Sequence, residues 1–202
     1  MKEYRQRSSE KLLEIVYSDK LGENVCFEEF IKLLGTRAFG IALLFFSLPS
    51  ALPFSAIPGV AFIFSTPIFF FAVQMILGRD TLWLPDIMAK KTVSHKSVVK
   101  IVSKTVPYLQ KAEYFLKPRW TFMTSRPMEI INGLIIMFLA ILLILPIPFS
   151  NFIFATLLII LSLGLIEKDG IFILIGYIAV LLYVSLISWF ITAAIQNIVE
   201  WL

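Results

Sequence analysis

The sequence predicts an all-α, polytopic integral membrane protein. We expect two pseudo-repeated helical hairpins broken by proline, amphipathic surface helices and one full C-terminal transmembrane helix. Three observations lead to this fold class. Of the 202 residues, 58% are hydrophobic, which is unusual for a soluble domain. Residues 38–77 and 131–166 contain no Asp, Glu, Lys, Arg or His. Each of these two apolar blocks is interrupted by closely spaced prolines.

Residues 1–37 are predicted to form an amphipathic helical N-terminus in the cytoplasm. They carry seven basic and seven acidic residues. Phe27, Phe30, Ile31 and Leu34 follow the i, i+3, i+4, i+7 spacing of one helical face, and Gly35 is a typical C-terminal stop. Apolar residues between 12 and 16 are interleaved with charge, which argues against the apolar core of a cleaved secretory signal.

The two apolar blocks, assigned to residues 38–77 and 131–167, share a common layout. Gly40 and Gly133 each precede the proline of a Leu-Pro step by 13 residues, and a Phe-Ser pair follows in both blocks. Each block closes on a basic residue followed by Asp, at 79–80 and 168–169. This layout indicates an internal duplication. The alternative is that any two helix–Pro–helix hairpins would align as well.

The apolar halves of these blocks are short for complete spans. They contain 14 to 18 residues, at 39–52, 60–77, 131–145 and 152–166, so as helices they are about 21–27 Å long. A bilayer core is about 30 Å thick. Each block therefore fits a re-entrant hairpin whose Pro-rich tip turns inside the bilayer. Four ordinary tilted spans, with prolyl turns outside the membrane, remain the alternative.

Charge sets the predicted orientation. Residues 78–130 contain ten basic and four acidic residues, and basic segments stay in the cytoplasm. We therefore expect both the N-terminus and 78–130 to be cytoplasmic, in a multi-pass protein of the inner (cell) membrane. The basic helical pattern at 93–106 is typical of a helix that lies on anionic membrane lipids. Residues 168–202 contain the uncharged stretch 171–195, which is long enough for one full span.

The residues argue against enzyme chemistry and give no catalytic candidate. GxSxG, GxxxxGK[ST] and HExxH motifs are absent, and the apolar blocks offer no paired carboxylates for acid–base work. The chain has one cysteine, Cys26, and one histidine, His95, so we expect no metal site and no cofactor. A nucleic-acid partner would not explain the long apolar segments, so we do not expect one.

The best ligand-binding candidates are polar residues at the ends of the blocks. Arginine presents a planar fork that suits phosphate, as in a polyprenyl-phosphate or phospholipid head group. The alternative is that the basic residues extend to lipid head groups while the Asp residues cap the next helix. A glutamine deep in the first block is included because a buried amide needs partners. The set is Arg37, Gln74, Arg79, Asp80, Arg126, Lys168 and Asp169.

The ordered landmarks resemble the exopolysaccharide synthesis protein ExoD family. They are GTRAFG (35–40), LPSALP (48–53), IPG (57–59), LGRDTLWLP (77–85), LPIPFSN (145–151) and GLIEKDG (164–170). The resemblance implies a bacterial inner-membrane protein needed for exopolysaccharide production and assigns no reaction. We expect it to handle or transport a lipid-linked anionic molecule where the hairpins meet. The alternative is a non-catalytic scaffold for polysaccharide biosynthesis enzymes, and a membrane enzyme is the weakest hypothesis.

Overall fold

The computed structural model describes residues 8–17, 24–52, 60–85, 89, 91–145 and 150–200. Most of both Pro-rich tips falls outside these ranges, at 53–59 and 146–149. The sequence predictions about tip geometry therefore concern residues that the structure does not describe. The helices that lead into and out of the tips are described, and they form the body of the molecule.

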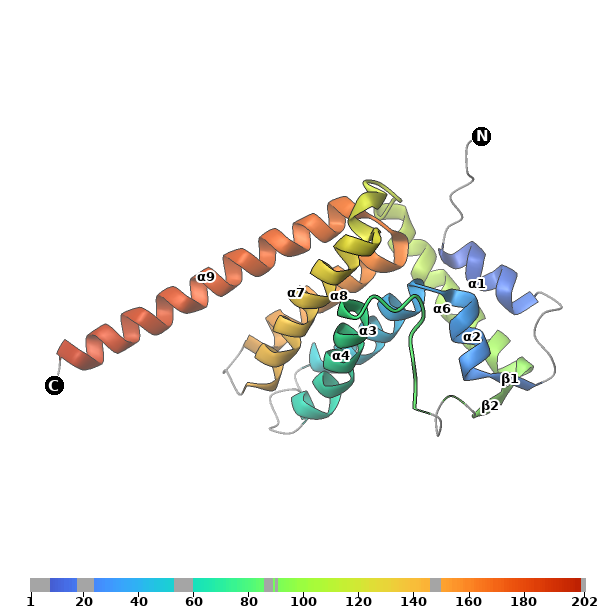
Figure 1. The fold of residues 1–202 in the computed structure, drawn as a ribbon, viewed down its shortest axis with the longest axis horizontal. Coiled ribbons are helices and arrows are strands. Elements are labelled where there is room, and N and C mark those ends of the chain that lie inside the picture. The colour runs from blue at the N-terminus through green and yellow to red at the C-terminus, as the bar shows by residue number, and fades with distance from the viewer. Residues whose placement is uncertain are drawn as a thin grey trace.

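Four helices make up this body (Figure 1). They are α3 (Arg37–Ser50), α4 (Val60–Ile76), α7 (Arg126–Ile144) and α8 (Ser150–Glu167). The most extensive packing joins α3 to α8 and α4 to α7, so each helix leans mainly on a helix of the other block.

Two glycines allow these close approaches. A Cβ atom on Gly40 would lie 3.0 Å from the Ser162 carbonyl oxygen on α8, and one on Gly133 would lie 3.0 Å from the Ala72 carbonyl oxygen on α4. Both distances are too short for a comfortable contact, so a larger residue would push the paired helices apart.

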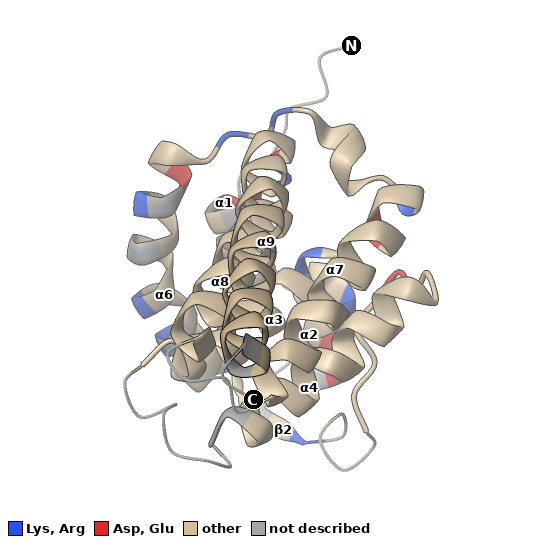
Figure 2. Ribbon diagram, turned by 90° about the vertical axis from the view of Figure 1, so that its left-hand side faces the viewer, with Lys and Arg blue, Asp and Glu red and all other residues tan. Residues whose placement is uncertain are grey.

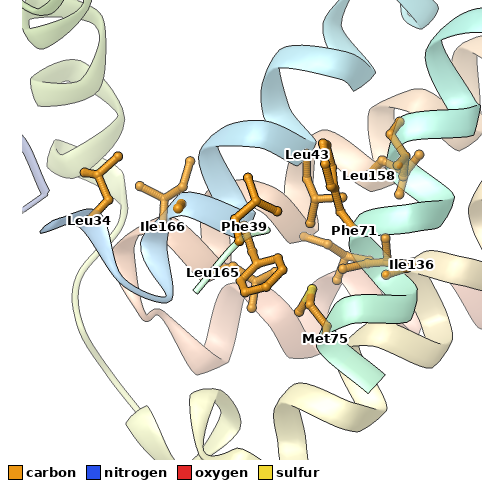
Figure 3. Packing of buried hydrophobic residues seen from close by; sticks show 14 of the residues in the cluster. Leu34, Phe39, Leu43, Phe71, Met75, Ile136, Leu158, Leu165 and Ile166 are labelled. Atoms are coloured by element: carbon orange, nitrogen blue, oxygen red, sulfur yellow. The ribbon is translucent and has the colours of Figure 1, made fainter. Parts of the chain in front are cut away.

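The hydrophobic core lies where the four helices converge. Leu43 of α3, Phe71 of α4, Ile136 of α7 and Leu158 of α8 are buried side chains that meet there (Figure 3). Within a membrane, where lipid is as apolar as these side chains, van der Waals contacts between the helices favour such packing. The two blocks therefore form one packed unit.

The C-terminal helix α9 (Gly170–Glu200) starts at the charged end of the body and runs back along α8. Gly176 packs against Leu161, and further on the Tyr183 hydroxyl donates to Ser150 Oγ at 3.0 Å. Ser150 is the first residue of α8, so α9 passes the end of that helix at Tyr183. The rest of α9 continues beyond it with exposed apolar side chains such as Leu186, Trp189 and Ile195.

Three helices are long and apolar enough to cross a membrane: Arg126–Ile144, Ser150–Glu167 and Gly170–Asn197. A fourth crossing is reached if the pair Glu28–Leu34 and Arg37–Ser50, which is bent by 113°, counts as one broken span. The predicted all-α class with candidate membrane-spanning helices is confirmed, while the pseudo-repeat and the re-entrant hairpins remain predictions. Helix α4 is also apolar, but it is shorter than these candidate spans.

A cap of amphipathic helices covers one end of the body. It consists of α1 (Ser8–Tyr17), α2 (Phe27–Leu34) and α6 (His95–Phe115), followed by the short 3₁₀ helix η2 (Thr121–Thr124). The predicted faces are present: Ile31 and Leu34 of α2 are buried, and so are Val102 and Val106 of α6. Lys100 and Lys104 on the opposite face of α6 are exposed.

The cap also contains a short ladder that the sequence did not predict. The strands β1 (Asn24–Cys26) and β2 (Thr92–Ser94) pair antiparallel, with Val25 opposite Val93. Immediately after β2, His95 Nε2 donates to the Val16 carbonyl oxygen at 2.7 Å, which satisfies one of the last carbonyl groups of α1. Charged residues gather on the cap and the adjoining loops, whereas α9 is free of them over its described length up to 199 (Figure 2).

Candidate functional site

The helices α4 and α8 end in the same way, next to the cap. In both, the chain closes a Schellman motif, in which the two residues after the helix return their N–H groups to its last turn. Gly78 N donates to Met75 O and Arg79 N donates to Gln74 O. At the end of α8, Lys168 N donates to Leu165 O and Asp169 N to Gly164 O.

Both helix ends also contain a residue in the left-handed backbone conformation. Gly78 has φ 68° and Lys168 has φ 54°. The capping motif therefore aligns Gly78 with Lys168 and Arg79 with Asp169. The sequence comparison of the two basic–Asp pairs had instead matched Arg79 with Lys168, so the two alignments differ by one residue. Lysine has a Cβ atom, so the left-handed conformation costs it about 1–2 kcal/mol, and the surrounding structure must hold it there.

A small cavity joins the two ends. Arg79, which follows α4, and Lys168, which follows α8, both line it, together with Glu129 of α7 and the hydroxyl residues Thr36 and Thr124. Its free volume of about 10 Å³ corresponds to roughly one water molecule. Phe39, Met75 and Leu165 complete the lining, so side chains at the ends of both apolar blocks meet at one small cavity of mixed polarity.

The loop after α4 is held by side chains rather than by regular structure. Gln74 Nε2 donates to the Trp83 carbonyl oxygen at 3.2 Å, and Trp83 N donates to Gln74 Oε1 at 2.7 Å. Arg126 of α7 donates through Nη1 to the Gly78 carbonyl oxygen at 2.5 Å and forms an ion pair with Asp80. Gln74 is buried, so its two hydrogen bonds fix the backbone at Trp83 to α4.

This loop borders a second, larger pocket of about 400 Å³. Arg79, Asp80 and Trp83 line it from the loop, and Glu28 and Lys32 line it from α2. The guanidinium carbon of Arg79 lies 5.9 Å from the centre of the Trp83 ring, within the range of a cation–π contact. Arg79 therefore borders both this open pocket and the small cavity that it shares with Lys168, which we call the interface cavity.

Asp169 has a structural role at the other helix end. Its Oδ1 accepts from Ile171 N at 3.1 Å and from Phe172 N at 3.3 Å, which caps the first turn of α9. Its Oδ2 accepts from Lys117 N at 2.9 Å and lies 3.9 Å from Arg119 Nε. Asp169 is 2% exposed. Because its two oxygens accept from different segments, it ties α9 to the segment before η2.

Arg37 is half-buried and lies near two buried carboxylates. The carboxylates of Glu167 and Glu113 are close enough to interact electrostatically with its guanidinium, and both are almost fully buried. Glu113 accepts from Ser9 N and Ser9 Oγ, each at 2.7 Å, which fastens α1 to α6. Burial, followed by the nearby charges of Arg37 and Lys168, lowers the pKa of Lys11.

The structure thus separates the predicted residues into three groups and leaves Arg37 apart, beside Glu167 and Glu113. Arg79 and Lys168 share the interface cavity, Arg126 and Asp80 form an ion pair beside it, and Asp169 and Gln74 hold backbone segments. Ligand binding by these residues remains a prediction. Among the described residues, no group of three or more His, Cys, Asp or Glu side chains could hold a metal ion.

Sequence reasoning missed Glu129 and Trp83. Glu129 follows Arg126 by three residues on α7, a spacing that places both on one helical face, so the local pattern carried a usable signal. Trp83 carried none, because its importance comes from contacts with Gln74 and Arg79 that depend on how the loop folds.

A family model and one of two similar proteins indicate the same family. The model of the family described as "Exopolysaccharide synthesis, ExoD" matches residues 9–189. An uncharacterized protein of Synechocystis sp. is 34% identical over 165 residues, which cover 81% of this chain and 77% of that protein. Protein ExoD of Rhizobium meliloti is 28% identical over 200 residues, which cover 96% of this chain and 82% of that protein. No solved structure matches.

Proposed function

The chain belongs to the exopolysaccharide synthesis family ExoD, and from this premise we propose that it handles a lipid-linked anionic molecule during that synthesis. The protein is a multi-pass component of the bacterial inner membrane in this proposal. The anionic group of the ligand lies between the ends of the two hairpins, and the protein performs no covalent chemistry on it.

One observation carries the proposal. Arg79 and Lys168 follow different apolar blocks and line the same cavity. Lys168 is half-buried and Arg79 is exposed, so the two cations together can attract a phosphate at the edge of this small cavity, where both can donate charge-assisted hydrogen bonds to it. The hydroxyl residues Thr36 and Thr124 on the same wall offer further hydrogen bonds to phosphate oxygens.

The course of α9 supports re-entrant hairpins. The uncharged stretch 171–195 is about 37 Å long as a helix, enough for one tilted span. The helix passes the start of α8 at Tyr183, which is only about 20 Å from its own beginning. If α9 crosses the membrane once, the second hairpin turns near the middle of the bilayer.

The packing also supports an approximate two-fold relation between the blocks. Exchanging the blocks converts the α3–α8 contact into the α7–α4 contact, and these are the two most extensive contacts. Gly40 meets Ser162 and Ile166 on α8, while Gly133 meets Ala72 and Ile76 on α4. Paired, interrupted hydrophobic segments of this kind mark the binding sites of many transporters. The basic cap lies on the cytoplasmic side in this proposal.

A double substitution tests the headgroup site. We expect Arg79→Ala with Lys168→Ala to weaken binding of a fluorescent polyprenyl phosphate to the protein in lipid nanodiscs by at least about tenfold, since two charge-assisted contacts are lost. Lys104→Ala with Lys111→Ala is the matched control, because it removes the same charge from exposed positions on α6. Equal binding by wild type and the double variant would contradict the proposal.

The scaffold remains a second candidate because of the exposed lysines of α6. Lys96, Lys100, Lys104 and Lys111 all face away from the body, and such a face suits an acidic protein partner or anionic lipids. In this case the Lys104→Ala, Lys111→Ala variant loses association with biosynthetic proteins and exopolysaccharide output, while polyprenyl phosphate binding stays intact. The reverse pattern favours headgroup handling.

A further inference from the structure

We propose that the pocket of about 400 Å³ between α2 and the loop 78–84 binds the sugar of a glycosyl phosphate. This inference rests on the proposed function and deepens it, because Arg79 lines both this pocket and the interface cavity. The ligand class is therefore a lipid-linked sugar phosphate, with the phosphate near Arg79 and Lys168 and the sugar beside Trp83.

The size and composition of the pocket suit a small polar ligand. Its volume lies within the range of small-molecule sites, about 300–1,000 Å³. Its wall combines an indole, aliphatic side chains such as Ile31 and Leu84, and charged groups. Mixed walls of this kind place a few directed polar contacts around an apolar surface.

Trp83 provides a fixed apolar surface. Its side chain is 53% exposed, while its backbone is fastened to α4 through both amide atoms of the buried Gln74. An exposed indole on a fixed backbone offers a flat apolar face to the C–H groups of a sugar ring. Because the backbone at Trp83 is already held, binding has only the side chain to order there, which lowers the entropic cost.

Arg79 connects the two cavities chemically. Its guanidinium carbon lies 5.9 Å from the centre of the Trp83 ring, and a guanidinium beside an aromatic ring still has N–H groups to donate in its own plane. These N–H groups match the oxygens of a phosphate. A phosphate on Arg79 would place its attached sugar beside the same indole.

The opposite wall suits hydroxyl groups. Lys32 Nζ lies 2.6 Å from Glu28 Oε1 on α2, and Asp80 is paired with Arg126 on the other side. Paired charges are close to neutral as a unit, yet they present both donors and acceptors. Sugar hydroxyls both donate and accept, so this wall favours a neutral polyhydroxylated group over a second anionic one.

The test compares two lipid probes in nanodiscs, a polyprenyl diphosphate and the same lipid carrying one hexose. We expect wild type to bind the glycosylated probe about tenfold more tightly, which corresponds to about 1.4 kcal/mol. In Trp83→Leu this preference falls to about onefold. Trp120→Leu is the matched control, because Trp120 is equally exposed but does not line the pocket, and it keeps the preference.

Three results would overturn the inference, and they differ from failure of the proposed function. They are equal binding of both probes by wild type, an unchanged preference in Trp83→Leu, and binding of phosphatidylglycerol as tight as that of the glycosylated probe. In each case the bare diphosphate still binds and responds to Arg79→Ala with Lys168→Ala. If wild type binds neither polyprenyl probe, the proposed function fails, and this inference fails with it. A monodisperse gel-filtration peak for Trp83→Leu excludes misfolding as the cause.

Discussion

The chain leaves α4 and α8 through the same capping motif, but the two exits have opposite surroundings. After α8, the residue that completes the motif is Asp169, which is buried and caps α9 directly. After α4, the equivalent residue is Arg79, which is exposed and borders two cavities. The α8 exit is closed by protein contacts, whereas the α4 exit is open to a ligand.

This difference shows how one local motif serves two purposes. At the closed exit, the polar groups of Asp169 are all engaged with backbone N–H groups and Arg119, so it contributes to stability. At the open exit, the loop itself is fixed by Gln74 and Arg126, which leaves Arg79 and Trp83 at the surface. We therefore expect substitutions of Asp169 to change folding, and substitutions of Arg79 or Trp83 to change binding.

The largest expected effect is at the closed exit. Asp169→Ala removes the cap of α9 and the acceptor for Lys117 N. Loss of a cap costs about 0.5–2 kcal/mol, and buried N–H groups left without partners cost about 1–3 kcal/mol. We expect about 3 kcal/mol of lost stability, measured as a fall in the thermal unfolding midpoint of detergent-solubilised protein. Asp169→Asn retains the capping oxygen and should recover part of the loss. A midpoint unchanged by Asp169→Ala would contradict the closed-exit interpretation.

The sequence predicted the parts of the molecule that depend on local pattern. The buried faces at Ile31 and Leu34, and at Val102 and Val106, follow from helical periodicity alone. The capping role of Asp169 was also foreseen as one of two alternatives, because an Asp immediately before a new apolar helix is a local signal.

Contacts between distant segments could not be predicted in this way. The β1–β2 ladder joins residues about seventy positions apart through Val25 and Val93, and three-residue strands carry too little periodicity to be recognised. That Arg79 and Lys168 meet was a hypothesis based on the matched ends of the two blocks. The hydrogen-bond partners of Gln74 were not foreseen. Such contacts depend on how the helices pack, which local periodicity in the sequence does not reveal.

The second prediction makes the two exits more alike. Lys168→Gly places at the α8 end the residue that α4 already has at Gly78. Glycine adopts the left-handed conformation without the Cβ clash, so we expect a gain of about 1 kcal/mol in thermal stability. The same change removes a cation from the interface cavity and should weaken polyprenyl phosphate binding, as is common where function requires strain. The mirror variant, Gly78→Lys, should lose stability by a similar amount. A loss of stability in Lys168→Gly would show that the lysine side chain supports the fold.

The smallest effect is expected at the open exit, at the ion pair between Asp80 and Arg126. Both side chains are more than half exposed, at 69% and 60%, and exposed pairs contribute at most about 0.5–1 kcal/mol. We expect Asp80→Ala to lower stability by about 0.5 kcal/mol or less, and the difference should shrink further at 1 M salt because ions screen exposed charges. The expected loss of stability for Asp169→Ala is then about six times the loss for Asp80→Ala, although both acids follow the ends of equivalent helices. A loss near 3 kcal/mol in Asp80→Ala would mean that the α4 exit is closed in the membrane. The pocket beside Trp83 would then be unavailable to a ligand.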